Sequence, residues 1–100
     1  MTPVALVLRV GRPGTLTQSD LVGRLRVAVD ASSDVEHAFI AGCSALAGGA
    51  IELQAVLYVL GSDHARAVGV VAELSGPLVD AGATLVTVLP APWGHGQMWP

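Results

Sequence analysis

One stretch decides the fold: Val35-Glu-His-Ala-Phe-Ile-Ala-Gly-Cys-Ser-Ala-Leu-Ala47, then Gly48-Gly49, then Ile51-Glu-Leu-Gln-Ala-Val-Leu-Tyr-Val-Leu60. The second run, residues 51–60, has the β-branched and aromatic residues that are typical of a strand. If residues 35–47 are also a strand, Gly48-Gly49 forms a two-residue turn and the whole stretch is an antiparallel hairpin.

Residues 35–47 also fit a helix. Ser33 would be the N-cap and Glu36 would complete a capping box. Four apolar residues would then share one helical face: Val35, Phe39, Cys43 and Leu46. The alanine and glycine content favours this helix, whereas the hairpin gives the simpler topology, so we predict the hairpin and keep the helix as the alternative.

The flanking segments alternate between strands and helices. The pattern predicts a strand at Val4–Val10, a helix at Thr17–Val29, a helix from the N-cap Ser62 to Leu74 and a strand at Thr84–Leu89. The first helix has an apolar face formed by Leu21, Val22, Leu25, Ala28 and Val29. Ser75-Gly76-Pro77 interrupts the second helix, since proline removes a backbone donor and its ring clashes inside a helix.

This order predicts an α+β fold, a ferredoxin-like βαββαβ sandwich with a four-stranded antiparallel sheet and two helices on one face. Residues 1–90 would form this single domain, and residues 91–100 a C-terminal arm with both tryptophans. The alternative is an α/β fold with a mostly parallel sheet, in which Arg24–Asp30 is a strand and Val35–Ala47 a helix.

Composition narrows the classes of function. Apolar residues make up 52% of the chain and charged residues only 13%, so a domain this small has surplus apolar surface. We therefore expect a homo-oligomer or a protein partner. Without a basic stripe, at net charge −3, we expect no nucleic-acid binding, and without a long apolar run no membrane partner. The single cysteine and the lack of a signal segment predict a cytoplasmic protein.

The turn after the first strand is the predicted ligand site. Its binding residues are Gly11, Arg12, Gly14, Thr15 and Leu16. Glycines on both sides of Pro13 allow a tight turn and leave backbone N–H groups accessible, and the start of a helix attracts a carboxylate or phosphate. Arg12 would add a charge-assisted hydrogen bond to the anion. A plain connector between strand and helix is the competing interpretation.

The same turn resembles that of a known family. A strand ending in Arg12-Pro13-Gly14-Thr15-Leu16, a helix, a hairpin and a helix that starts at Gly61-Ser62-Asp63-His64 resemble an ACT domain. That resemblance implies a small, non-catalytic regulatory module with the ferredoxin-like fold. It also implies an amino-acid effector at a subunit interface. Val27–Ser32 is similar instead to the first unit of universal stress proteins, which implies nucleotide binding through Asp30.

No residue pattern specifies an enzyme, a metal site or a cofactor. His37 lies beside Glu36, but residues adjacent on a strand face opposite sides and the spacing has no zinc signature. Cys43 has no adjacent base and reads as a buried structural residue. A small dimeric α/β-barrel enzyme is kept as an alternative, with His37 as its polar cavity residue.

The arm supplies the predicted interface residues Trp93, Met98 and Trp99. Aromatic and methionine side chains are enriched in the cores of interfaces. The arm would therefore dock on a neighbouring subunit or protein partner, or pack back over its own sheet. Binding another protein through the sheet and this arm makes a structural or assembly subunit the second functional hypothesis.

Overall fold

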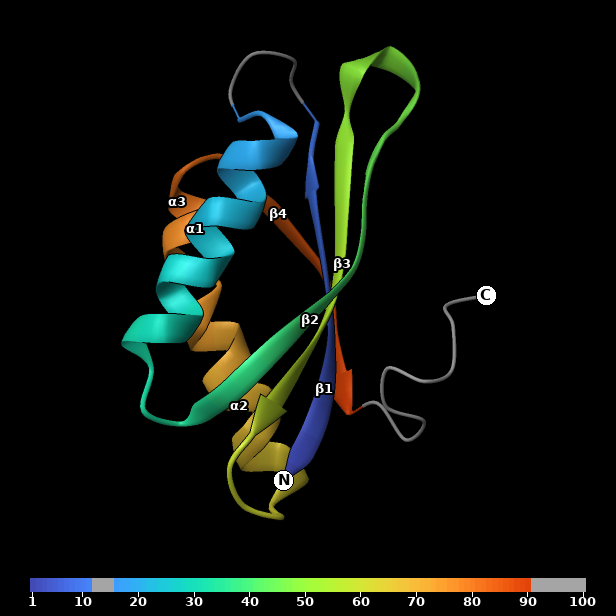
Figure 1. Ribbon diagram of the computed structural model, residues 1–100. Helices are drawn as coiled ribbons and strands as arrows, with labels where there is room; N and C mark the ends of the chain where they lie inside the picture. Colours follow the sequence, from blue (N-terminus) through green and yellow to red (C-terminus); the bar gives the residue numbers. More distant parts are fainter. Residues whose placement is uncertain (12–15, 91–100) are drawn as a thin grey trace.

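The computed structural model describes residues 1–11 and 16–90, which form one sheet covered by helices (Figure 1). In chain order the elements are β1 (Thr2–Val10), α1 (Gln18–Ala31), β2 (Val35–Ala45), a 3-10 turn (Ala47–Gly49), β3 (Ile51–Val59), α2 (His64–Leu74), α3 (Gly76–Asp80) and β4 (Thr84–Pro90). The predicted α+β class is confirmed, and every predicted strand and helix is present.

The sheet has the strand order β2-β3-β1-β4, and all neighbouring strands are antiparallel. The α/β alternative is wrong at both of its deciding segments, because residues 24–30 lie in α1 and residues 35–45 form β2. Because β3 lies between β2 and β1, the backbone N–H and C=O groups of this apolar strand have hydrogen-bonding partners on both of its edges.

The hairpin turn is longer than the predicted two residues. β2 ends at Ala45, and the backbone N–H of Leu46 donates to the carbonyl of Ala50 at 2.6 Å. Gly48 and Gly49 have φ angles of 77° and 85°, which side chains with a Cβ rarely adopt. The glycine pair therefore does close the hairpin, but inside a five-residue loop.

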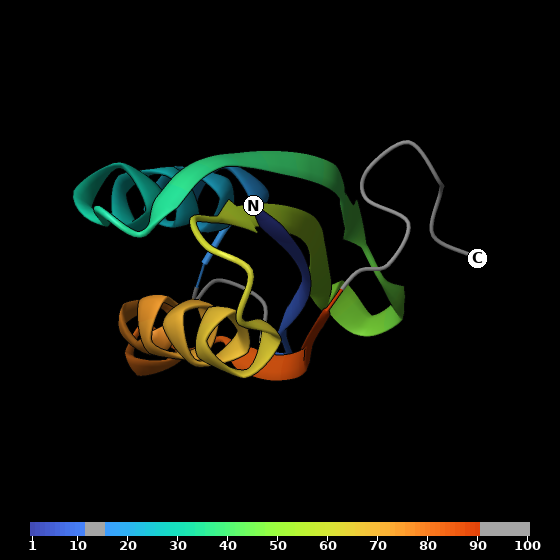
Figure 2. The same ribbon diagram turned by 90° about the horizontal axis from the view of Figure 1, so that it is seen from below.

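All the helices cover the same face of the sheet, which curves around them (Figure 2). Alternate residues of β1 and β3 point to that side and form the core with the buried residues of α1, Leu21, Leu25 and Val29. The predicted apolar face of α1 is thereby confirmed. Other buried core residues are Val4, Leu6, Leu8, Leu53, Leu57, Val71 and Leu78.

Side chains define the helix ends. Thr17 and Asp20 form a capping box, in which the Asp20 N–H donates to Thr17 Oγ1 and the Thr17 N–H to Asp20 Oδ2, both at 3.1 Å. The N-cap of α2 is Asp63, whose Oδ1 accepts from the Arg66 N–H at 3.1 Å, rather than the predicted Ser62. None of the helices in the described part is long and apolar enough to cross a membrane.

Candidate functional site

A groove runs along the outer side of α1, between this helix and the α2–α3 pair. Its larger part has a volume of about 660 Å³ and is lined by Ser19, Asp20, Gly23, Arg24, Val27, Ala28, Ala31 and Pro77. A further 310 Å³ lies along α2, and the two parts share Ala28, Ala31 and Pro77. We call this feature the helical groove. Its size falls within the range of small-molecule sites in proteins, roughly 300–1,000 Å³.

The helical groove exists because several residues of α1 that line it are small. Gly23, Ala28 and Ala31 fill little volume, and a Cβ built on Gly23 would meet no atom within 4 Å. Pro77 lies in the first turn of the short α3, which follows α2, and borders the side of the groove opposite α1. Val27, whose side chain is 70% exposed, adds apolar surface to the floor of the groove.

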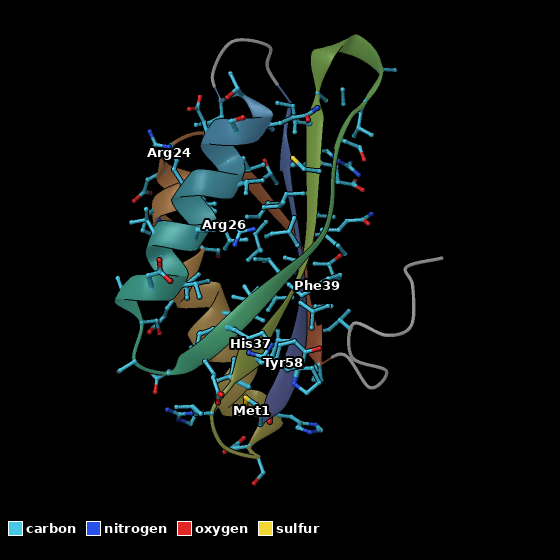
Figure 3. The ribbon with its side chains drawn as sticks, in the orientation of Figure 1. Met1, Arg24, Arg26, His37, Phe39 and Tyr58 are labelled. Carbon is cyan, nitrogen blue, oxygen red and sulfur yellow. The ribbon has the colours of Figure 1, made fainter. Side chains whose placement is uncertain are left out.

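One cation and one anion stand at the end of the helical groove near the start of α1. Hydrogen bonds from the backbone and side chain of Thr17 hold the pKa of Asp20 below its usual value, and the charge of Arg24 acts in the same direction. Asp20 is therefore ionised at neutral pH. Among the ion pairs of the described residues none involves Arg24, which points away from the sheet (Figure 3).

The predicted ligand turn lies between β1 and α1 in the sequence and is described only at its ends. Gly11 is exposed and Leu16 is buried in the core, while Arg12, Gly14 and Thr15 lie outside the described residues. The binding role of this turn stays a prediction. Two residues beyond Thr15, the capping box already occupies the backbone donors of Thr17 and Asp20.

The groove-lining residues were missed in the sequence. The signal was present, because Ser19, Gly23, Val27 and Ala31 follow one another at helical i, i+4 spacing on the face opposite Leu21 and Leu25. Small residues on the outer face of a helix do not predict a groove by themselves, since its other wall comes from α3.

His37 lies on the face of the sheet that the helices leave uncovered. Its ring stacks on that of Tyr58, with centroids 4.4 Å apart and planes at 21° (Figure 3). His37 pairs with Tyr58 across the strands, and Glu36 is the extra residue of a β-bulge. Within residues 1–11 and 16–90 no group of three His, Cys, Asp or Glu side chains could hold a metal ion. The arrangement supplies a stacking surface.

A smaller pocket of about 190 Å³ lies between α1 and β2. Arg26, Asp30, Glu36 and His37 contribute to its lining. Arg26 extends toward β2, on the opposite side of α1 from Arg24 (Figure 3). Asp30 belongs to helix α1 here and does not follow a strand, so the arrangement implied by the likeness to universal stress proteins is absent at Val27–Ser32.

Cys43 packs against the core from β2, opposite Leu53, and is half-buried. Burial raises the pKa of its thiol, so the sulfur is protonated at neutral pH. Cys43 is thus less buried than the sequence predicted, because part of its side chain remains exposed. Trp93, Met98 and Trp99, the predicted interface residues, lie outside the described part of the chain.

No protein-family model matches the chain, and no curated protein matches its sequence.

Proposed function

We propose that this chain is a small, non-catalytic effector-binding module of the ACT type, with the ferredoxin-like fold. The strand order β2-β3-β1-β4 supports the fold assignment, because two βαβ crossovers interleaved in one antiparallel sheet produce this order. The observation that carries the function is the helical groove, which begins at the N-terminal end of α1, the helix that follows the turn of the family resemblance in the sequence.

The ligand is a free amino acid with an aliphatic side chain. Arg24 and Asp20 offer one positive and one negative group at the same end of the groove, which complements the carboxylate and ammonium groups of a zwitterion. The floor formed by Gly23, Val27 and Ala28 then receives the aliphatic side chain. Arg12, predicted from the sequence to bind the carboxylate, lies outside the described residues.

Isothermal titration calorimetry with valine, leucine and isoleucine tests the proposal. We expect saturable binding by the wild-type chain and weaker binding of the corresponding deaminated acids, which lack the ammonium group. Arg24→Gln removes a charged hydrogen bond at an exposed rim, so affinity should fall about 10-fold. Gly23→Leu should abolish binding by filling the groove.

Two matched variants separate these effects from general damage. Arg26→Gln removes the same charge from the opposite side of α1, and Gly69→Leu makes the same enlargement on α2, where a Cβ meets no atom within 4 Å. Both should bind as the wild type does. If no amino acid binds, or if Arg26→Gln weakens binding as much as Arg24→Gln, the proposed site is wrong.

An assembly subunit is the second candidate function. The observation in its favour is the set of exposed apolar residues on the sheet, Phe39, Val86 and Leu89. Sedimentation of the full chain over a 100-fold range of concentration tests it. If the measured mass is that of one chain at every concentration, self-assembly is excluded. A mass that increases with concentration supports it.

A further inference from the structure

The uncovered face of the sheet carries a row of apolar residues that crosses all four strands. Cross-strand pairing places Phe39 of β2 opposite Val56 of β3, Val56 opposite Ala5 of β1, and Ala5 opposite Leu89 of β4. Val56 and Ala5 are buried in the middle, and Phe39 and Leu89 are 39% and 45% exposed at the two sides. We call these four residues the apolar row.

The same face becomes polar toward the hairpin turn. There Arg9 Nη2 lies 2.6 Å from Glu52 Oε2, and Gln54 Nε2 donates to Glu52 Oε1 at 3.0 Å. A sheet face that meets water normally carries polar side chains, whereas the face on the core carries apolar ones. His37 and Tyr58 occupy the opposite end of this face, so the apolar row lies between two polar ends and requires a cover of limited size.

The chain itself supplies a segment of suitable position and length. Leu89 belongs to the apolar row, β4 ends at Pro90, and residues 91–100 follow at once. Ten extended residues reach roughly 33 Å. Crossing from β4 to β2 takes three strand spacings, or roughly 14 Å. The segment can therefore span the row with length to spare.

The composition of this segment also matches the row. Ala91–Pro100 has no charged residue and contains both tryptophans of the chain and one of its two methionines. Each tryptophan can bury about 150–250 Å² of surface, so two are enough to cover the exposed parts of Phe39 and Leu89. A tethered segment also acts at an effective concentration in the millimolar range, which favours it over a second copy of the chain.

We propose that residues 91–100 fold back over the apolar row of their own chain, with Trp93, Met98 and Trp99 providing the cover. This interaction is separate from the helical groove, which lies on the other side of the molecule, and so does not depend on the proposed ligand. It assigns the predicted interface residues to an intramolecular contact.

Tryptophan fluorescence of the full chain tests this directly, because Trp93 and Trp99 are its only tryptophans. We expect blue-shifted emission and an acrylamide quenching constant at least about 2-fold below that of the chain in denaturant. Leu89→Asp should release the segment and raise the quenching constant toward the denatured value. Val79→Asp, at a 42% exposed apolar residue of α3 that does not line the helical groove, should leave the quenching constant unchanged.

A second measurement holds even if Leu89→Asp fails to fold. Nuclear Overhauser contacts between the indole protons and the Ala5 methyl group are expected in wild-type protein. In a mixture of labelled and unlabelled chains they should arise within one chain only. Contacts between chains would overturn the proposal in favour of a second copy, and tryptophans as accessible in the native chain as in denaturant would overturn it outright.

Discussion

Replacing Leu25 with alanine tests whether α1 packs on the sheet as described. Leu25 lies in the middle of α1, its side chain is fully buried, and it belongs to the main core cluster. Truncating a buried leucine costs about 2–5 kcal/mol, because apolar contacts are lost and a cavity remains. We expect about 3 kcal/mol, a large part of the roughly 5–15 kcal/mol that stabilises a domain.

Val27→Ala is the matched control, two residues further along the same helix. Val27 is 70% exposed, so its truncation should change the free energy of unfolding by less than about 0.5 kcal/mol. Urea unfolding followed by circular dichroism measures both variants, and an unchanged m-value shows that the same surface is exposed on unfolding. At about 4–8 °C per kcal/mol, Leu25→Ala should lower Tm by about 12–24 °C. Equal effects of the two substitutions would refute the packing of α1.

Three further outcomes follow from single residues. Gly82→Ala should destabilise the fold by about 1 kcal/mol or more, because Gly82 has a φ of 117°. Gly23→Ala should stabilise the protein by about 0.5–1 kcal/mol, because Gly23 lies inside α1 and a Cβ there meets no atom within 4 Å. Thermal melts that rank the two variants the other way would contradict this. The hydrogen bond from Arg9 lowers the pKa of Glu52, and this partly exposed pair adds less than about 1 kcal/mol of stability. That stability is present above the ordinary glutamate pKa of about 4.3 and is lost as the pH falls through the lower pKa of the folded state. In an NMR titration the pKa of Glu52 should rise in Arg9→Gln, and an unchanged pKa would exclude the pair. Cys43 should react with a thiol reagent at pH 7 much more slowly in the native than in the denatured chain, and equal rates would contradict its burial.

The helices and the middle of the sheet were predictable because their periodicity is regular. In α1 the apolar residues recur at helical spacing, and Leu21, Leu25 and Val29 are indeed buried together. In β3 an alternating strand pattern places Leu53 and Leu57 on the helix side. In both elements the sequence pattern and the burial have the same period.

The segment 35–47 was ambiguous for a physical reason. Two β-bulges interrupt β2, with Glu36 and Ala41 as the extra residues, and each bulge shifts the alternation of the side chains. Val35 and Cys43 consequently face the helices although Phe39, midway between them, is on the other face. The helix-like spacing of these apolar residues therefore marks no common face, because the bulges that separate them depend on pairing with β3 and leave no local signal in the sequence.

The candidate site was harder to predict than the fold. The turn after β1 had a recognisable glycine and proline pattern, whereas the helical groove depends on how α3 diverges from α2 at Pro77. Arg24 gained its place in the candidate site only through its position on the outer side of α1. Tertiary packing, rather than any motif, brings these residues together.

Chemical-shift mapping on the ¹⁵N-labelled full chain tests the central claim, that the helical groove takes an aliphatic amino acid. On titration with leucine, the backbone amide signals of Gly23, Arg24 and Ala31 should shift together along one saturation curve. Signals of Gln54 and Thr87, on the uncovered face of the sheet, should stay in place. Saturable shifts confined to the sheet, or no shifts at millimolar leucine, would contradict the account.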